Sequence, residues 1–178
     1  MNLSLKTNRL YLRLPQEEDV DELFKLMSNT ELTRFLSWEA HKDRHSTTVV
    51  LNSLIESQKN DKGYHWCICI EDKIIGIVSL FDVKRVIRTW TLNRAELAYW
   101  ITPNFQGKGY ITEACEAILK VGFDRLGLHK IIVAHAQENI ASESVCRKLG
   151  FQQYAHEHDA FFKDGVWHDL IWYELIKI

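Results

Sequence analysis

The chain has 178 residues, of which 46% are apolar and 26% charged, and its formal net charge is −2. This length and composition are typical of one globular domain, which we expect to span residues 1–178. The small net charge gives no overall field that would attract nucleic acid or an anionic membrane. No run approaches the roughly 18 apolar residues that span a bilayer. The four cysteines form no C-x-x-C pair, and the first residues have no apolar core as long as that of a secretion signal. Both observations favour a reduced, cytoplasmic protein with free thiols.

The first third of the chain predicts one strand and two helices. Leucines at 10, 12 and 14 alternate with polar or aromatic residues, which is the period of a half-buried strand. Pro15 and the acidic residues 17–19 suit the first turn of a helix, and apolar residues continue at helical spacing to Met27. Residues 43–60 predict a second helix by the same spacing.

The middle of the chain predicts three strands. Residues 64–71 and 73–83 are rich in β-forming residues and separated by a short polar break, which predicts an antiparallel hairpin. Residues 84–93 are polar and predict a loop. Residues 94–101 predict a fourth strand.

The last third predicts two helices and three strands. Residues 110–126 have one apolar face at helical spacing, and Asp164-Gly165 is a strong hairpin-turn signal. The other predicted elements are a strand at 130–136, a helix at 142–149 that ends at Gly150, and strands near 151–162 and 166–177. The whole order predicts an α/β fold with a mixed sheet, in which a helix crossover joins the fourth and fifth strands.

A glycine loop at the end of the fourth strand carries the most informative pattern. It leads directly into the helix at 110–126, and the first amides of a helix are unpaired and partially positive. Gly107 and Gly109 let a phosphate approach the backbone closely, Lys108 adds a positive charge, and Thr112 adds a hydroxyl. The loop fits neither the G-x-G-x-x-G nor the Walker pattern, so a glycine turn without a ligand is the alternative interpretation.

Several motifs together resemble the GNAT acetyltransferase superfamily, and within it the ribosomal-protein N-terminal acetyltransferases of the RimJ/RimL type. The resemblance covers nearly the whole chain. Its motifs occur in the family's order at residues 7–13, 95–101, 106–110, 127–131, 139–142, 148–151 and 164–169.

The resemblance implies a GNAT-like fold in which the fourth and fifth strands splay apart and acetyl-CoA inserts between them. It places the pyrophosphate on amides of residues 106–111 and the pantetheine arm beside the fourth strand. No metal is implied. The binding residues implied are Trp100, Ile101, Gln106, Gly107, Lys108, Gly109, Tyr110, Ile111, Thr112 and Asn139.

Two positions depart from the superfamily pattern. Asn104 stands where Gln or Arg often precedes the loop, a minor change because backbone amides do most of the phosphate binding. Cys146 stands where many members carry the tyrosine proposed to protonate the departing thiolate. The RimJ/RimL type is similar to this chain in having a serine at position 142, so the resemblance assigns the acid role to Ser142, for which helix capping is the alternative.

Acetyl transfer needs a neutral amine, a polarised thioester carbonyl and a proton for the leaving sulfur. An α-amine has a pKa of about 8, against about 10.4 for lysine, so a modest base suffices for an N-terminal substrate. Glu96, in the fourth strand, is the base candidate, and a surface ion pair is its alternative role. A backbone N–H near Trp100 or Ile101 is the candidate oxyanion donor.

Other reactive residues receive structural interpretations. His156 and His158 share a strand face, but no cluster of further ligands accompanies them, so we expect an exposed polar face. Cys67 and Cys69 are expected to be small buried side chains. Cys146 has no His/Asn partner pattern, and direct transfer needs no acyl-enzyme.

The sequence therefore predicts an acetyl-CoA-dependent N-acetyltransferase whose acceptor is the N-terminal α-amine of a protein, with a ribosomal protein as the partner. A small-amine acetyltransferase acting on a polyamine, amino sugar or aminoglycoside is one alternative, and a non-catalytic acyl-CoA sensor is another. The acidic run at 17–22, which a polyamine pocket could use, is interpreted as a helix start. The oligomeric state stays open, with a homodimer as one of the states considered.

Overall fold

The computed structural model describes residues 3–177, which are organised around one mixed eight-stranded sheet. Its spatial order is β1-β2-β3-β4-β5-β6-β8-β7. Within the described residues every neighbouring pair is antiparallel except β5 and β6, which run parallel. The predicted mixed α/β sheet is thus confirmed. The strands are β1 (Leu5–Lys6), β2 (Tyr11–Arg13), β3 (Tyr64–Ile70), β4 (Lys73–Ile87), β5 (Trp90–Ile101), β6 (Lys130–Ala136), β7 (Gln152–Lys163) and β8 (Val166–Ile176).

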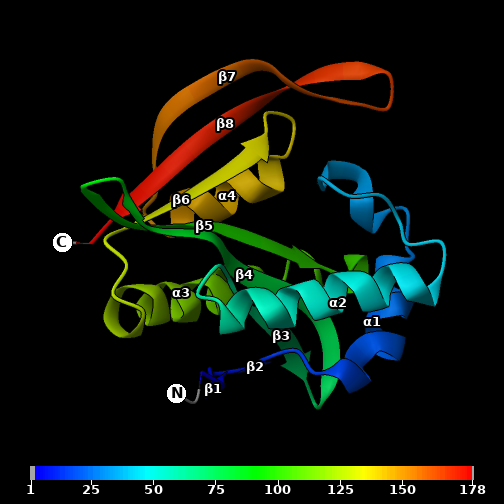
Figure 1. Cartoon of the computed structure of the whole chain (residues 1–178). Helices are drawn as coiled ribbons and strands as arrows, with labels where there is room; N and C mark the ends of the chain where they lie inside the picture. The colour runs from blue at the N-terminus through cyan, green and yellow to red at the C-terminus, as the bar shows by residue number, and fades with distance from the viewer. Residues whose placement is uncertain (1–2, 178) are drawn as a thin grey trace.

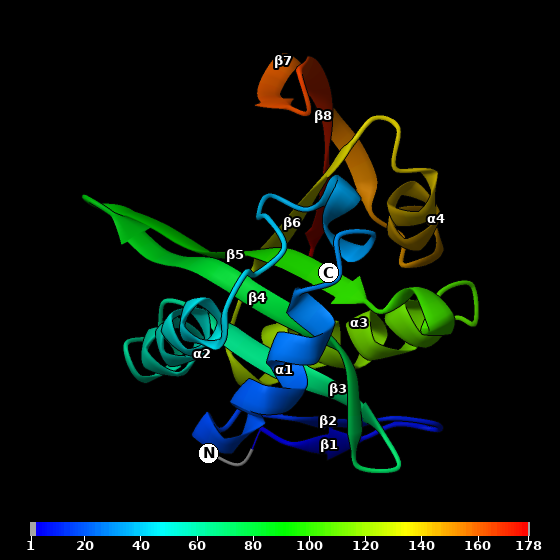
Figure 2. The ribbon, with the colours of Figure 1, turned by 90° about the vertical axis from the view of Figure 1, so that its right-hand side faces the viewer.

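Helices cover both faces of the sheet. Figures 1 and 2 show α1 and α2 on one face, α3 on the opposite face, and α4 beside β6. The α-helices are α1 (Val20–Met27), α2 (Arg44–Lys59), α3 (Tyr110–Lys120) and α4 (Ile140–Lys148). Short 3-10 turns are η1 (Glu17–Asp19), η2 (Leu32–Phe35) and η3 (Pro103–Phe105), and α3 runs on into a π-helical turn, η4 (Val121–Arg125). No helix in this part of the chain is long and apolar enough to cross a membrane.

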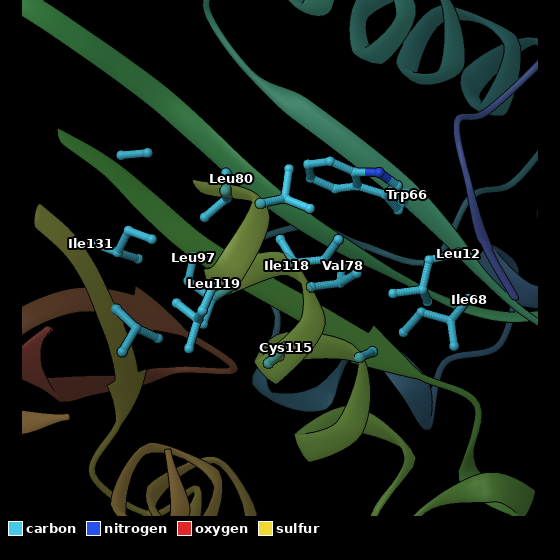
Figure 3. Packing of buried hydrophobic residues seen from close by; sticks show 14 of the residues in the cluster. Leu12, Trp66, Ile68, Val78, Leu80, Leu97, Cys115, Ile118, Leu119 and Ile131 are labelled. Carbon is cyan, nitrogen blue, oxygen red and sulfur yellow. The ribbon is translucent and has the colours of Figure 1, made fainter. Parts of the chain in front are cut away.

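Two buried clusters hold these layers together. On one face, Cys115, Ile118 and Leu119 of α3 pack against the sheet, as Figure 3 shows. On the other face, Val20, Leu23 and Met27 of α1 pack with Leu51 of α2. Because side chains alternate along a strand, Leu97 and Tyr99 of β5 join the α3 cluster while Trp100 packs on the α1 and α2 side.

The sheet opens at the end of β5. Strands β5 and β6 pair only at Arg94 with Lys130, Ala95 with Ile131 and Glu96 with Ile132. Beyond Glu96, β5 continues beside β4 as far as Ile101, whereas β6 remains beside β8 to its end. The predicted splay of the fourth and fifth strands is therefore confirmed. These two strands are β5 and β6 here, because the short β1 adds a strand that the sequence did not predict.

The predicted loop at 84–93 is wrong. Strand β4 extends to Ile87 and β5 begins at Trp90, so the segment is a long hairpin arm, which Figure 2 shows projecting from the body of the molecule. Val86 and Trp90 are 62% and 73% exposed, so the arm has no buried face to impose apolar alternation. Its β-branched and aromatic residues keep it extended instead.

The remaining elements follow the prediction with shifted ends. Helix α2 starts after Asp43, whose carboxylate accepts the backbone N–H of Ser46 at 2.7 Å. Helix α4 begins at Ile140 rather than at residue 142. The final hairpin turns at Asp164 and Gly165, whose φ angles of 53° and 81° match the expected turn.

Candidate active site

A cavity of about 440 Å³ lies at the opening between β5 and β6. Its walls come from the end of β5, the glycine loop with the start of α3, the start of α4, and the segment at residues 31–36. Figure 2 shows α3 and α4 flanking this opening. The predicted binding residues that line it are Trp100, Ile101, Gln106, Gly107, Gly109, Tyr110, Ile111, Thr112 and Asn139.

Lys108 does not line the cavity. Its ammonium group donates to the carbonyl of Asn104 at 2.9 Å and lies 5.4 Å from the centre of the Phe105 ring. The side chain is therefore held on the outer side of the loop. A direct contact between this lysine and a bound phosphate would require those two interactions to break.

The glycine loop presents a row of unpaired amides. The backbone N–H groups of residues 107–112 donate no hydrogen bond to any residue in the described range. Gly107 and Gly109 have φ angles of 72° and 79°, so the turn needs residues that tolerate the left-handed region. Successive amides in such a turn form a concave anion site at the positive end of α3.

Gln106 differs from its prediction in one respect. Its backbone N–H is already bonded to the carbonyl of Pro103 at 3.1 Å, so the row of available amides starts at Gly107. Its side-chain amide reaches the carbonyl of Ile101 at 3.3 Å and faces the cavity. The residue thus joins the loop to the open end of β5.

The free edge of β5 is set by strand alternation. Thr102 donates its backbone N–H to the carbonyl of Ile75 at 2.9 Å. Along an antiparallel ladder, every second residue directs its backbone N–H and C=O toward the neighbouring strand, and the residues between direct theirs away from it. The N–H of Trp100 therefore points toward β4, whereas those of Tyr99 and Ile101 point toward the opening. Trp100 contributes its side chain to the cavity rather than its amide.

Ser142 lies in the cavity wall opposite this edge. Its hydroxyl is 2.7 Å from the hydroxyl of Tyr99, and its backbone N–H donates to the Asn139 side chain at 3.1 Å. Asn139, not Ser142, is thus the residue that caps α4. Burial raises the pKa of Tyr99 far above its usual value, so the phenol stays protonated.

Tyr99 is a site residue that the sequence interpretation missed. Its position one residue before Trp100 places it on the opposite face of β5, toward α3 and α4. This alternation of side chains along the strand could have identified Tyr99 from the sequence. Cys146 lies next to this pair and is 1% exposed. Burial raises the pKa of its thiol to about 11, which fits the expectation that it is not a nucleophile.

Glu96 sits at the last paired position before the opening and does not line the cavity. By alternation it lies on the same face as Trp100, four residues along the strand, which is roughly 13 Å away at the strand rise. Burial, with a further contribution from Asp82, raises the pKa of its carboxyl above the ordinary 4.5. The group is therefore partly desolvated, as a general base often is.

The segment at 31–36 closes the cavity on the side of α1 and α2. The ammonium group of Lys163, in β7, donates to the carbonyls of Thr33 and Leu36 at 2.7 Å each. Trp38 packs edge-on against Trp100 with ring centres 6.2 Å apart. The sequence analysis did not include this segment in the site, and its position depends on a lysine about 130 residues away.

His156 and His158 are exposed and share a face, as predicted, with ring centres 4.2 Å apart. Both rings contact Oδ2 of Asp169, at 2.7 and 3.0 Å. Asp169 also accepts the backbone N–H of Asp159, and this bond and the histidines lower its pKa to about 2. The three side chains are close enough to hold a metal ion, but they lie on the outer hairpin and none lines the cavity.

Comparison with known proteins places this geometry in a family. Residues 9–152 match the Acetyltransferase (GNAT) domain. The chain is 33% identical to "Putative ribosomal N-acetyltransferase YdaF" of Bacillus subtilis (strain 168), over 93% of this chain and 90% of that protein. It is 27% identical to spermidine N(1)-acetyltransferase of Escherichia coli (strain K12), over 90% of this chain and 82% of that protein.

A solved structure of RimL, a ribosomal L7/L12 alpha-N-protein acetyltransferase in complex with coenzyme A, superposes with a TM-score of 0.88. It covers 96% of this chain and 95% of its own at 21% identity, which establishes the shared fold. The opened sheet and the family match together lead to one conclusion: the chain belongs to the GNAT acetyltransferase family and is an acetyl-CoA-dependent acetyltransferase.

Proposed function

We propose that this enzyme transfers the acetyl group of acetyl-CoA directly to the N-terminal α-amine of a protein, with a ribosomal protein as the acceptor. The observation that carries the proposal is the row of unpaired amides at residues 107–112, set beside the open edge of β5 in one cavity. That cavity continues to the segment at 31–36, which leaves room for an acceptor beyond the thioester.

The cavity wall divides into parts that match the parts of acetyl-CoA. The amides of residues 107–112 would hold the diphosphate at the start of α3. The outward backbone groups of Tyr99 and the outward carbonyl of Ile101 would pair with the pantetheine arm, and the side-chain amide of Asn139 would reach the same arm from α4. The thioester would then lie in the opening between β5 and β6.

The residues around the opening can supply the required proton transfers. As the amine nitrogen bonds to the carbonyl carbon, the N–H of Ile101 would stabilise the charge that develops on the oxygen. The C–S bond breaks as Ser142 gives a proton to the sulfur and regains one from solvent, while Tyr99 keeps its own proton and donates a hydrogen bond to the Ser142 oxygen. Glu96 would take the proton lost by the amine, acting through water because it lies outside the cavity wall.

Three points support an α-amine as the acceptor. An α-amine, with a pKa of about 8, already has about a tenth of its molecules neutral at pH 7, so a carboxylate acting through water is sufficient. The charged residues that line the cavity are Glu31, Arg34 and Lys148, so the wall is not acidic. The similarity to a protein named for ribosomal N-acetylation points the same way.

Acetylation of a polyamine is the second candidate, and the similarity to spermidine N(1)-acetyltransferase favours it. A polycation would require several free carboxylates in the cavity. The dense acidic run at 17–22 does not provide them, because none of its residues lines the cavity. In addition, Asp19 binds Arg13 at 2.7 Å, Asp21 binds Arg44, and Glu22 accepts the N–H of Ile74 at 2.8 Å. These last three carboxylates are engaged within the fold.

An acetylation screen tests the acceptor. Purified enzyme is incubated with acetyl-CoA and either ribosomal N-terminal peptides, their N-terminally blocked forms, spermidine or an aminoglycoside, and release of free thiol is followed. We expect turnover with free peptides and none with blocked ones. Preferential turnover of spermidine would establish the second candidate. Binding of acetyl-CoA, seen as a higher melting temperature, without turnover of any amine would indicate a sensor.

A further inference from the structure

The N-terminal segment before β2 makes contact with the glycine loop from outside the cavity. Arg9 donates from Nη1 to the backbone carbonyl of Lys108 at 2.9 Å and from Nε to Glu113 at 2.7 Å. Its guanidinium lies 4.5 Å from the centre of the Tyr110 ring. One side chain therefore spans the loop and the first turn of α3, about 100 residues later in the chain.

Glu113 is held at the centre of this arrangement. Its carboxylate accepts the hydroxyl of Thr7 at 2.6 Å, the backbone N–H of Arg9 at 2.8 Å and the Nε of Arg9. Burial alone would raise its pKa, but these bonds from Thr7 and Arg9 outweigh burial and lower it, so the group is ionised at neutral pH. A charged carboxylate with three donors fixes the segment at 7–9 firmly onto α3.

The bond to Lys108 has a geometric consequence for the cavity. A trans peptide unit directs its C=O and its next N–H in opposite directions. Because Arg9 holds the carbonyl of Lys108 on the outer side, the N–H of Gly109 is directed away from Arg9. Gly109 lines the cavity and neither Arg9 nor Lys108 does, so this amide faces the anion site.

We propose that Arg9 and Glu113 are positioning residues that pre-set the loop amides for the diphosphate of acetyl-CoA. They act through the peptide unit between Lys108 and Gly109, and neither touches the acetyl group. The inference rests on the proposed location of the diphosphate at residues 107–112. Without Arg9 the loop must be ordered when the ligand binds, which weakens binding.

The test separates the diphosphate from the rest of the ligand. Dissociation constants for coenzyme A and for pantetheine, which keeps the arm and thiol but lacks the diphosphate, are measured by calorimetry at a temperature well below unfolding. For Arg9→Met we expect about tenfold weaker binding of coenzyme A, from the loss of a charge-assisted bond, and unchanged binding of pantetheine.

Glu113→Gln distinguishes positioning from simple charge attraction. The substitution leaves the site more positive, so an electrostatic role for Arg9 predicts tighter binding of coenzyme A. A positioning role predicts that Glu113→Gln binds coenzyme A more weakly and binds pantetheine as the wild type does. Tighter or unchanged binding of coenzyme A by this variant would overturn the inference.

Arg85 provides a matched control. It makes the same kind of contacts, with the Asp61 carboxylate and the carbonyl of Leu126 at 2.8 Å each, but neither Leu126 nor the next residue, Gly127, lines the cavity. Arg85→Met should lower stability comparably and leave both dissociation constants unchanged. If the wild type binds pantetheine as tightly as coenzyme A, the proposed diphosphate site itself is wrong. If it prefers coenzyme A and the Arg9 and Glu113 variants keep that preference, only the positioning role is wrong.

Discussion

The hydroxyl groups of Tyr99 and Ser142 lie 2.7 Å apart, although β5 and α4 bring them from positions 43 residues apart in the chain. Tyr99 remains protonated because burial raises its pKa, so it can donate to Ser142 while Ser142 donates onward. The pair lies on the α3 and α4 side of the opening, whereas Glu96 lies on the α1 and α2 side. The proposed acid and base thus lie on opposite sides of the sheet.

Ser142→Ala should lower kcat by about 10²-fold with little change in the KM for acetyl-CoA, because the leaving sulfur loses its proton donor. Tyr99→Phe should lower kcat less, by about tenfold, since one neutral hydrogen bond is lost. Steady-state kinetics with the identified acceptor measure both. Ser144→Ala is the control, because Ser144 lies on the same helix and lines the same cavity. Equal kcat values for Ser142→Ala and Ser144→Ala would remove Ser142 from the acid role.

Glu96→Gln should bind acetyl-CoA normally and turn over slowly. The wild-type kcat/KM should fall as the pH drops through the pKa of Glu96, because the base must be ionised. Since burial raises that pKa, the acid limb of the profile should lie above pH 4.5. The contribution of Glu96 to the free energy of unfolding changes with pH in the opposite direction. Folding favours the protonated carboxyl, so this contribution is present at low pH and is lost as the pH rises through the same pKa. An unchanged kcat for Glu96→Gln on the true acceptor would exclude Glu96 as the base.

Gly76→Ala should damage the cavity from the far side of β5. A Cβ at this position would lie 2.2 Å from the carbonyl oxygen of Trp100 and 2.9 Å from Cα of Ile101, both backbone atoms. We expect a loss of about 3 kcal/mol in unfolding free energy, typical of severe overpacking, together with weaker acetyl-CoA binding. Denaturant unfolding and calorimetry measure the two effects.

Gly122→Ala is the control for that variant, because its Cβ would meet only side-chain ends, those of Ile131 and Leu80 at 3.0 Å and of Leu128 at 3.3 Å. These side chains can rotate, so the loss should be smaller and acetyl-CoA binding unaffected. Equal losses in the two variants would show that Gly76 is not required for the close approach of β4 and β5.

His65 should make folding sensitive to mild acid. Burial lowers its pKa to about 4 from 6.5, and its ring bridges Ser57 of α2 and Ser79 of β4 at 2.9 and 2.8 Å. The unfolded chain takes up a proton below pH 6.5 while the folded chain does not. The free energy of unfolding should therefore fall by about 3 kcal/mol as the pH decreases from 6.5 to about 4.

Denaturant unfolding of the wild type and of His65→Gln across this pH range measures the effect. The variant should be less stable at pH 7 but lose less stability on acidification. His45→Gln, at an exposed position of α2, should keep the wild-type dependence. An identical pH dependence for the wild type and His65→Gln would contradict the assignment.

Local patterns predicted most of the elements because their residues contact neighbours within a few positions. The apolar face of α3 and the Asp164-Gly165 turn follow from spacing that a helix or turn imposes on its own sequence, and the strand at 130–136 follows from its short run of apolar, β-forming residues. The arm formed by the ends of β4 and β5 could not be predicted this way. It buries neither face, so no apolar alternation distinguishes it from a loop.

The candidate site divides in the same way. The glycine loop is a local feature, since two left-handed residues and a helix start are encoded by consecutive residues, and so the sequence by itself determined the loop and the family. The tertiary structure decided which groups meet across it: Arg9 with Glu113, Tyr99 with Ser142, and Lys163 with the segment at 31–36. These contacts join elements that lie far apart in the chain, and their geometry depends on how β5 and β6 diverge rather than on any spacing along the sequence.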